Sequence, residues 1–212
     1  MTKSVSFGTC QLCSERKGKA AMVGHLKRCF PASSARDGSS SEVLLLRVQG
    51  GAQMFWLDLV ATREATLRDI DRLLRRIWLE CCGHLSQFYV GAHRRKVGMS
   101  TKVGEVFASI GNRLGYVYDF GSSTELVVSF AGCAEAGSEN PVRIVARNEP
   151  LAWPCDTCGQ AATSVCAQCS YEGGFCCAKH GDSHECGEEM LLPVVNSPRM
   201  GVCGYTGEEN SQ

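Results

Sequence analysis

A short run of cysteine and histidine residues constrains this chain more than any other stretch. Nine thiol or imidazole side chains fall within the 32 residues from Cys155 to Cys186. They are Cys155, Cys158, Cys166, Cys169, Cys176, Cys177, His180, His184 and Cys186. A Cys-x2-Cys turn presents two thiolates to one tetrahedral ion, and two such ions need eight ligands. The run therefore predicts a module that holds two zinc ions.

A disulfide framework is the alternative explanation for so many cysteines. The sequence opens Met-Thr-Lys-Ser, without the apolar segment that directs a chain to secretion. This opening favours a reducing compartment, where thiols bind metal rather than pair with one another. We therefore expect zinc ligation and a cytoplasmic location.

The ligands of the two ions can be shared out in two ways. Sequential filling puts the first four cysteines on one ion and the remaining ligands on the other. Interleaving gives one ion Cys155, Cys158, Cys177 and His180, and gives the other Cys166, Cys169, His184 and Cys186. We favour interleaving, because it clips both ends of the segment together and avoids crowding the last ligands. Cys176 is an alternative to Cys177.

The order of these ligands resembles that of the AN-1-type zinc finger, a small interleaved two-zinc fold. The likeness lies in two Cys-x2-Cys turns, then Phe175-Cys176, then His180 and a final His184-x-Cys186. The spacing differs from that family, since only three residues separate His180 from His184. The resemblance implies a protein-binding or structural module rather than an enzyme.

A second cysteine and histidine pattern lies near the N-terminus. It reads Cys10-x2-Cys13-x11-His25-x3-Cys29, the spacing of a CCHC finger with one zinc ion. His25 and Cys29 are four residues apart, so a helix places them on one face. A segment this short buries too little surface to fold alone, and metal binding on the order of 10 kcal/mol would supply the stability. We therefore expect three zinc ions in the chain.

The charge is unevenly spread, although the formal net charge is zero. Residues 1–30 hold six basic side chains and one acidic one, whereas residues 155–212 hold two basic and eight acidic ones. We expect the finger to present four basic side chains outward: Lys17, Lys19, Lys27 and Arg28. A basic surface of this kind fits contact with nucleic-acid phosphates, and it equally fits a structural finger with solvated lysines.

Composition leaves room for one medium-sized domain and small satellites. Apolar residues make up 44% of the chain and charged residues 21%, as in ordinary globular proteins. No apolar run approaches the roughly 18 residues of a membrane-spanning helix, so no membrane partner is expected. Outside the ligand runs, Cys81, Cys82 and Cys133 are interpreted as buried apolar fillers.

Composition shifts divide the chain into segments. The serine-rich stretch before residue 42 predicts a flexible linker, which would tether the finger loosely. The expected segments are a CCHC finger at 1–32, a linker at 33–41, a main domain at 42–147, a proline-bounded linker at 148–154, the two-zinc module at 155–187 and a tail at 188–212.

The main domain shows strand patterns followed by a helical one. Strands are expected at Val43–Val48, Met54–Val60, Gln87–Val90, Tyr116–Asp119, Glu125–Phe130 and Val142–Ala146, with a turn at Gly50-Gly51. Apolar residues recur every three or four positions from Thr66 to Cys82, which predicts one long amphipathic helix. A short helix is expected around Val103–Ile110. The fold class is therefore α+β: a central sheet with one long amphipathic helix packed on it, flanked by two small zinc-bound modules.

Three stretches of this domain resemble the plasmid pRiA4b ORF-3-like family. They are Thr66–Asp69, Gly83–Phe88 and Tyr116–Gly121, of which the Tyr-Asp-Phe-Gly run is the most specific. The likeness covers about residues 42–132. The chain departs from the family pattern after Gly121 and at Ser86, where the family has histidine. The resemblance implies an association with transposons and plasmids, and it brings no assigned biochemical activity.

Candidate catalytic residues are His84, Asp119 and Glu125. Histidine and carboxylates at strand ends or turns can converge in a cleft and exchange protons. The competing interpretation is that Asp119 forms a turn and that His84 caps a helix. No paired nucleophile and base is evident, which favours the structural interpretation.

The C-terminal residues add three smaller expectations. Trp153 is placed to pack the two-zinc module against the main domain. The apolar run from Met190 to Val195 predicts a strand, and Arg199 and Cys203 beyond it could contact a ligand, although pairing of this tail with a sheet is favoured. The whole pattern predicts a zinc-binding adaptor or nucleic-acid-associated accessory protein linked to mobile genetic elements, with a protein or nucleic-acid partner. The alternative is an enzyme with a polar cleft at the three candidate residues.

Overall fold

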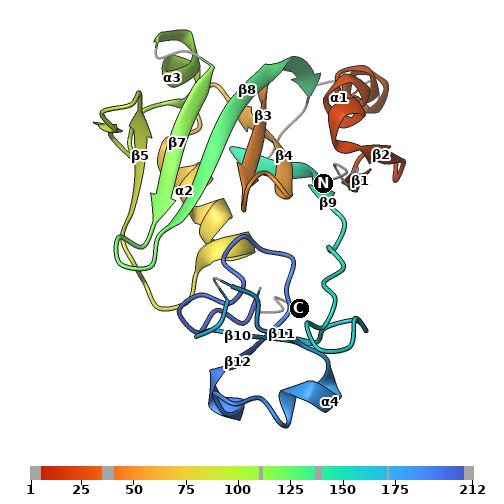
Figure 1. Cartoon of the computed structure of the whole chain (residues 1–212). Helices are drawn as coiled ribbons and strands as arrows, with labels where there is room; N and C mark the ends of the chain where they lie inside the picture. The colour runs from red at the N-terminus through yellow and green to blue at the C-terminus, as the bar shows by residue number, and fades with distance from the viewer. Residues whose placement is uncertain (1–5, 35–40, 110–111, 137–139, 171, 208–212) are drawn as a thin grey trace. The chain divides into compact units, whose positions relative to one another are not determined.

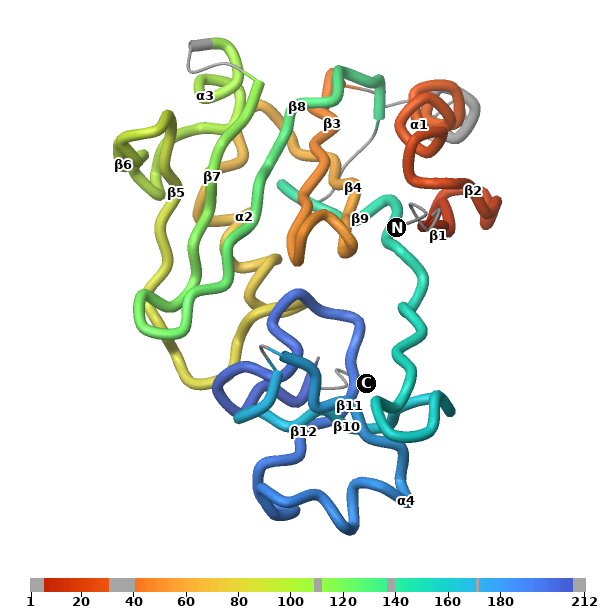
Figure 2. The backbone as a smooth tube through the Cα atoms, viewed as in Figure 1, coloured from red at the N-terminus to blue at the C-terminus, as the bar shows by residue number. Residues whose placement is uncertain are grey.

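The computed structural model describes residues 6–34, 41–109, 112–136, 140–170 and 172–207. These residues form two compact units (Figures 1 and 2). The first unit comprises the described parts of Met1–Leu73, Ser86–Tyr118 and Glu125–Glu149, and the second those of Leu74–Leu85, Asp119–Thr124 and Pro150–Gln212. None of the helices described is both long and apolar enough to cross a lipid bilayer.

The first unit is built on a nine-stranded antiparallel sheet of order β2-β1-β9-β4-β3-β8-β7-β5-β6. Its strands are β1 (Phe7–Cys10), β2 (Arg16–Gly18), β3 (Ser41–Gly50), β4 (Phe55–Thr62), β5 (Ser86–Val90), β6 (Arg95–Val97), β7 (Arg113–Tyr118), β8 (Thr124–Ala136) and β9 (Val142–Asn148). Its helices are α1 (Lys19–Ser34), α2 (Leu67–Leu74) and α3 (Val103–Ser109). The strands expected in the main domain are therefore present, with shifted ends, and Ile110 of the expected short helix lies outside the described residues.

The β3–β4 hairpin forms the centre of this sheet. Both strands are rich in leucine and valine, and all but the last residue of β4 is buried. Successive side chains of a strand point to opposite faces of the sheet, so a strand in which nearly all side chains are buried is covered on both faces. The turn occurs at the expected place, where the amide of Met54 donates to the carbonyl of Gly51 at 3.0 Å.

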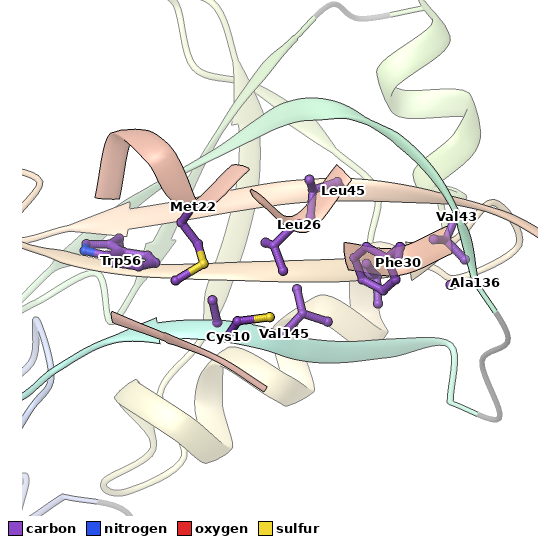
Figure 3. Packing of buried hydrophobic residues seen from close by; sticks show 11 residues of the cluster. Cys10, Met22, Leu26, Phe30, Val43, Leu45, Trp56, Ala136 and Val145 are labelled. Atoms are coloured by element: carbon purple, nitrogen blue, oxygen red, sulfur yellow. The ribbon is translucent and has the colours of Figure 1, made fainter. Parts of the chain in front are cut away.

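The N-terminal finger is part of this unit. Met22, Leu26 and Phe30 lie four residues apart along α1 and pack with Leu45 and Trp56 of the sheet (Figure 3). Strand β1 also pairs with β9. The expectation of a loosely tethered finger is wrong, because the apolar face of α1 is buried on the sheet and β1 extends the hydrogen-bonded ladder.

The linker expected at 33–41 falls mostly on residues 35–40, which lie outside the described residues. Ser34 is the last residue of α1, and Ser41 is the first residue of β3. The ends of the expected linker thus belong to regular elements.

The expectation of one long helix from Thr66 to Cys82 is also wrong. The α-helix α2 ends at Leu74, a π-helical turn (η1, Arg75–Leu79) follows, and Glu80 is extended. Buried Leu73 and Leu74 are followed five residues later by buried Trp78 and Leu79. A π turn has bonds between residues five apart, so it keeps these side chains on one face where an α-helix would rotate them away.

Helix α2 packs on the sheet as expected. Asp71 of α2 accepts hydrogen bonds from the hydroxyl of Tyr116 in β7, at 2.8 Å, and from the hydroxyl of Ser86, at the start of β5, at 2.6 Å. The longest helix of the first unit is α1, with 16 residues. The fold is therefore a large antiparallel sheet with several short helices.

The second unit contains a small sheet of order β11-β10-β12. Its elements are η1, β10 (Ser164–Cys166), β11 (Phe175–Cys176), α4 (Ala178–Gly181), the 3-10 turn η2 (Glu188–Met190) and β12 (Leu191–Pro193). The strand expected after Met190 is thus present and pairs with β10. Trp153 stacks on Phe175, with ring centroids 4.6 Å apart, so its described ring contact lies within the two-zinc module.

The residues after β12 pack within the second unit. The indole of Trp78 donates to the carbonyl of Asn196 at 3.1 Å, and Ser197 donates to the carbonyl of Trp78 at 2.6 Å. Ser197, Arg199 and Tyr205 are all buried. This segment is therefore part of the core of the unit, and residues 208–212 lie outside the described residues.

Candidate metal centres

Four groups of side chains, each with three cysteines and one histidine, bring their ligand atoms together. Within each group, all four sulfur or nitrogen atoms lie within 4.8 Å of one another. The groups are site 1 (Cys10, Cys13, His25, Cys29), site 2 (Cys155, Cys158, Cys177, His180), site 3 (Cys166, Cys169, His184, Cys186) and site 4 (Cys81, Cys82, His84, Cys203). All fourteen cysteines are free thiols, so none is joined in a disulfide. Clusters of this composition fit zinc.

Site 1 is formed by the knuckle after β1 and one face of α1. The amide of Ser14 donates to the carbonyl of Cys10 at 2.8 Å, which closes the Cys-x2-Cys turn. The sulfur of Cys13 lies 3.3 Å from Nε2 of His25. Burial and the neighbouring thiols of Cys13 and Cys10 raise the pKa of Cys29 to about 12. A divalent cation would offset that mutual repulsion between thiolates.

Site 2 combines a second knuckle with the start of α4. The amide of Gly159 donates to the carbonyl of Cys155 at 2.8 Å, and the amide of His180 donates to the carbonyl of Cys177 at 3.0 Å. These turns bring Nδ1 of His180 to 3.5 Å from the sulfur of Cys155 and 3.4 Å from that of Cys177. Hydrogen bonds from backbone amides, the largest from Cys177, lower the pKa of Cys155 to about 6. The thiolate needed for metal binding is therefore favoured.

Site 3 lies between β10 and the loop after α4. The sulfur of Cys169 is 3.6 Å from that of Cys186 and 3.7 Å from Nε2 of His184. Burial disfavours the charged form of Cys166, but amide hydrogen bonds, the largest from Cys169, lower its pKa to about 7. Sites 2 and 3 alternate along the chain, so the side chains are interleaved.

Cys177, and not Cys176, lies with the other ligand atoms of site 2. Cys176 is buried, and its sulfur contacts the carbonyl of Gly174 at 3.7 Å and Nδ1 of His184 at 3.8 Å. Adjacent residues of a strand point to opposite sides, so only one of the two can face site 2.

These separations match tetrahedral coordination. A Zn–S bond of about 2.3 Å places sulfurs at two corners of a tetrahedron about 3.8 Å apart. The sulfurs of Cys158 and Cys177 in site 2 are 3.8 Å apart, and those of Cys169 and Cys186 in site 3 are 3.6 Å apart. Both pairs are far beyond the roughly 2.05 Å of a disulfide bond. The side chains are thus arranged as ligands of a shared ion.

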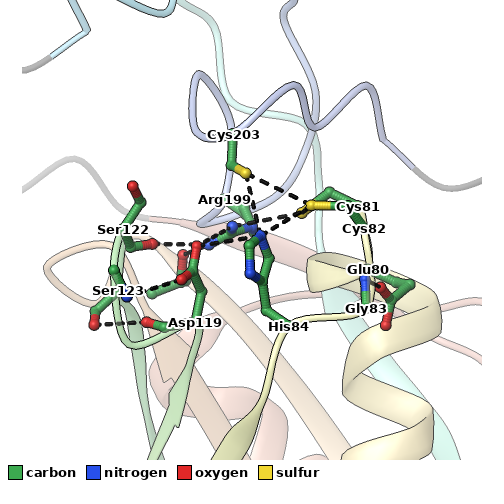
Figure 4. A network of polar contacts seen from close by, with 12 residues as sticks. Glu80, Cys81, Cys82, Gly83, His84, Asp119, Ser122, Ser123, Arg199 and Cys203 are labelled. Carbon is green, nitrogen blue, oxygen red and sulfur yellow. Dashed lines mark hydrogen bonds and ion pairs between the residues drawn. The ribbon is translucent and has the colours of Figure 1, made fainter.

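Site 4 was not expected from the sequence. Its ligands come from the loop after η1 and from the C-terminal segment (Figure 4). The interpretation of Cys81 and Cys82 as buried fillers is wrong, because Cys82 is exposed and Cys81 only half-buried; Cys133 is also exposed. Cys81 and Cys82 lie in the loop after η1, and loops run over the surface, where no apolar core covers their thiols. The compact Cys-Cys-x-His spacing was the signal for this site, but its fourth member is remote in sequence.

Asp119 and Arg199 form a buried ion pair beside site 4. Nη2 of Arg199 donates to Oδ2 of Asp119 at 2.8 Å and to the sulfur of Cys81 at 3.4 Å (Figure 4). Its Nη1 donates to the carbonyl of Ser122 at 3.0 Å and to Oγ1 of Thr124 at 3.1 Å. The hydrogen bond from Arg199 lowers the pKa of Asp119. Arg199 is therefore a fixed part of the second unit.

The three candidate catalytic residues are divided between the two units. Nε2 of His84 lies 3.5 Å from Oδ2 of Asp119, so these two are neighbours. Glu125 belongs to the first unit, where it pairs with Arg94 and accepts from the hydroxyl of Tyr89 at 3.4 Å. Asp119 also has φ of 64° and accepts from the amide of Gly121 at 2.9 Å, which is the turn-forming role considered for it. The contacts described for Glu125 are thus with Tyr89 and Arg94 of its own unit.

The four basic residues of the finger differ in their surroundings. Lys27 and Arg28 are exposed. Lys17 pairs with Glu15 at 2.6 Å. The ammonium of Lys19 donates to the carbonyl of Gln53 at 2.7 Å, and burial lowers its pKa. The expectation that Lys19 points outward is wrong, because the packing of α1 on the sheet brings its side chain to the β3–β4 turn.

Comparisons with known proteins give little further information. No known family model matches this chain, and no curated protein matches it. Among solved structures, it is similar to a crystal structure of a protein of unknown function from Methanosarcina mazei Go1. The similarity has 15% sequence identity and a TM-score of 0.43, and it covers 57% of this chain and 76% of that chain. The function must therefore be argued from the sites themselves.

Proposed function

We propose that this protein binds zinc at sites 1, 2 and 3, and that the ions hold its two cysteine-rich modules in their folded form. The observation that carries the proposal is the convergence of three sulfurs and one imidazole nitrogen in each group. Closed four-ligand sites of this composition are typical of structural zinc, whereas catalytic zinc keeps an open position. The proposed role is therefore structural and not catalytic.

Zinc content tests this proposal directly. Each of Cys13→Ser, Cys158→Ser and Cys169→Ser removes one ligand from a different site, and each should lower the zinc content by one ion per chain. Cys133→Ser is the matched control, because Cys133 is an exposed thiol outside all four groups. Elemental analysis of protein purified without chelators gives the count. Variants that retain the wild-type count would contradict the proposal.

The zinc-stabilised fold serves, in this proposal, as an adaptor for a protein partner. Leu85 is 72% exposed and Phe120 is 57% exposed. Their segments are adjacent in the second unit, since the amide of Asp119 donates to the carbonyl of Leu85 at 2.9 Å. Large apolar side chains exposed together support a protein-binding surface.

A capture experiment tests the adaptor role. The double variant Leu85→Ala, Phe120→Ala should lose a partner that the wild-type chain retains. Met54→Ala is the control, because Met54 is another large apolar side chain, 43% exposed, in the first unit. Equal capture by the double variant and by wild type would remove this surface from the proposal.

A nucleic-acid role is the second form of the proposal and rests on Lys27 and Arg28. Both are exposed on α1, which also carries His25 and Cys29 of site 1. Two phosphate contacts would give a slope of about −2 in log affinity against log salt. Lys27→Ala with Arg28→Ala should abolish that dependence, and Lys179→Ala should not. Nucleic-acid binding that is unchanged in the double variant would exclude a role for Lys27 and Arg28. An association with mobile genetic elements is proposed on the family resemblance alone.

A further inference from the structure

We propose that site 4 is a fourth zinc site and that its ion exchanges with the surroundings faster than those of the other three sites. The proposal rests on the zinc chemistry proposed for sites 1 to 3. Site 4 would differ from sites 1 to 3 in how readily its ion exchanges, because each of those sites includes a buried cysteine and site 4 includes none.

The geometry of site 4 is that of a shared ion. The sulfur of Cys82 lies 3.7 Å from that of Cys81 and 3.8 Å from that of Cys203. Nε2 of His84 lies 3.0 Å from the sulfur of Cys82 and 3.2 Å from that of Cys203. The sulfur separations equal the edge of about 3.8 Å expected for tetrahedral zinc. Figure 4 shows these side chains pointing toward one another.

The composition of site 4 repeats that of the other three sites. The chain has five histidines and fourteen cysteines. Each of the four groups contains one histidine and three cysteines, which leaves only His93, Cys133 and Cys176 outside them. An accidental meeting of thiols would have no reason to use the same ligand set. The repetition supports selection of the same metal.

The surrounding residues hold these ligands in place. Arg75 donates to the carbonyl of His84 at 2.7 Å, and the amide of Gly83 donates to Glu80 at 2.6 Å. Cys203 has φ of 51°, a left-handed conformation that is strained for a non-glycine residue. Strain of this kind persists where the surrounding structure fixes the residue, which fits a ligand that is directed at an ion.

Arg199 adds a second, independent indication of a metal site. Its fully buried guanidinium donates to the sulfur of Cys81. A buried side chain that donates to a ligand atom is a partner of the kind that orients metal ligands. Asp119 in turn holds Arg199, so a buried ion pair supports one ligand of site 4.

Exposure distinguishes site 4 from the others. Cys82 and Cys203 are exposed, and no ligand of site 4 is buried. Each of the other sites includes a buried cysteine: Cys10, Cys155 or Cys166. Because the shell around a metal controls the access of solvent and competing ligands, we expect release of the site 4 ion to be about tenfold faster or more.

Zinc counting combined with chelator competition tests the inference. Wild type should contain four ions per chain, Cys203→Ser three, and the control Cys133→Ser four. A chromophoric zinc chelator, 4-(2-pyridylazo)resorcinol, should remove one ion from wild type in a fast phase that Cys203→Ser lacks. The three ions retained in the variant would show that the other sites remain folded. If Cys203→Ser loses more than one ion, Cys203→His decides the matter, because an imidazole ligand should restore four.

Several results would overturn the inference. Three ions in wild type with an unchanged count in Cys203→Ser would show that site 4 holds no zinc. Four ions in both proteins, a fast phase that persists in Cys203→Ser, or three ions in Cys203→His would do the same. A count that falls with Cys13→Ser, Cys158→Ser and Cys169→Ser, but not with Cys203→Ser, would leave the proposed function standing. No zinc in any of these proteins would remove both.

Discussion

Asp58 and Arg47 form a largely buried ion pair in the large sheet. Asp58 of β4 is fully buried and receives two hydrogen bonds from Arg47 of β3, at 2.8 and 2.7 Å. Arg47 also donates to the carbonyl of Lys19 at 2.7 Å, which joins the start of α1 to the sheet. Burial raises the pKa of Asp58, and the bonds from Arg47 oppose that rise. Removing either residue would leave the other as an unpaired buried charge, which destabilises the folded protein.

Removing Arg47 should therefore be costly. We expect Arg47→Ala to lower the free energy of unfolding by about 3–5 kcal/mol, because it leaves an uncompensated buried carboxylate. Arg63→Ala is the matched control, since Arg63 and Glu42 form an exposed pair, and solvent screens such pairs so that their contribution is much smaller. Urea unfolding of both variants measures the difference. Equal losses would show that Asp58 does not depend on Arg47.

At the scale of elements, strand β1, which lies between β2 and β9, joins the finger to the sheet. Gly8 of β1 lies directly opposite Asn148 of β9. A Cβ atom at Gly8 would lie 2.3 Å from the carbonyl oxygen of Arg147 and 2.5 Å from Cη2 of Trp56. Only glycine allows β1 to approach β9 this closely.

A methyl group at this position should displace β1. We expect Gly8→Ala to destabilise the first unit by about 1–3 kcal/mol. It should also weaken zinc binding at site 1, because Cys10 lies at the end of β1. Gly24→Ala in α1 meets only Nη1 of Arg28 at 3.7 Å and should instead stabilise the helix by about 0.5–1 kcal/mol. Unfolding curves and zinc counts of the two variants test this, and a harmless Gly8→Ala would contradict it.

The start of α2 gives a prediction about pH. Oδ2 of Asp69 accepts from the amide of Thr66 at 2.9 Å and from its hydroxyl at 2.7 Å. The bond from the Thr66 amide lowers the pKa of Asp69. A carboxylate with a lowered pKa stabilises the fold above its unfolded pKa of about 3.9, and that contribution disappears as the pH falls through the folded pKa.

Replacing Asp69 should remove this pH-dependent contribution. We expect Asp69→Asn to cost about 1 kcal/mol near neutral pH, with the difference from wild type shrinking below about pH 4. Urea unfolding at a series of pH values measures it. A difference that is constant over this range would show that the charge of Asp69 does not act on the helix start.

At the scale of the whole molecule, the two units are stabilised in different ways. The first unit has a continuous apolar core that includes Leu45, Trp56 and Val60. In the second unit, the buried side chains include four cysteines, three of which are ligands of sites 2 and 3. Small modules of this kind depend on metal for their folding.

Removal of metal should therefore affect the units unequally. With a zinc chelator, we expect amides of β10, β11 and β12 to lose protection from hydrogen exchange, while those of β3 and β4 keep it. Addition of zinc should restore protection, and addition of magnesium should not, because magnesium prefers oxygen ligands. Mass spectrometry of exchanged peptides gives the measurement. Unchanged protection in the second unit would show that its fold does not depend on metal.

Features that depend on residues close together in the chain could be predicted from the sequence, and features that depend on distant residues could not. The knuckles at Cys10 and Cys155 follow from residues close together in the chain, and so do the strands β3, β4, β5, β7, β8 and β9. The helix after Thr66 was predicted too long, because a π turn is set by what Trp78 and Leu79 are buried against. The position of α1 on the sheet was not predicted either, because it depends on packing against residues that are distant in the sequence.

The sequence by itself determined that cysteines and histidines gather as candidate metal-ligand sets toward both ends of the chain, because a Cys-x2-Cys turn positions its sulfurs locally. Only the tertiary structure decided that β1 joins the sheet and that Cys203 meets Cys81, Cys82 and His84. Those contacts link residues more than a hundred positions apart. Spacing along a chain carries no information about such meetings, since they depend on the packing of the segments between.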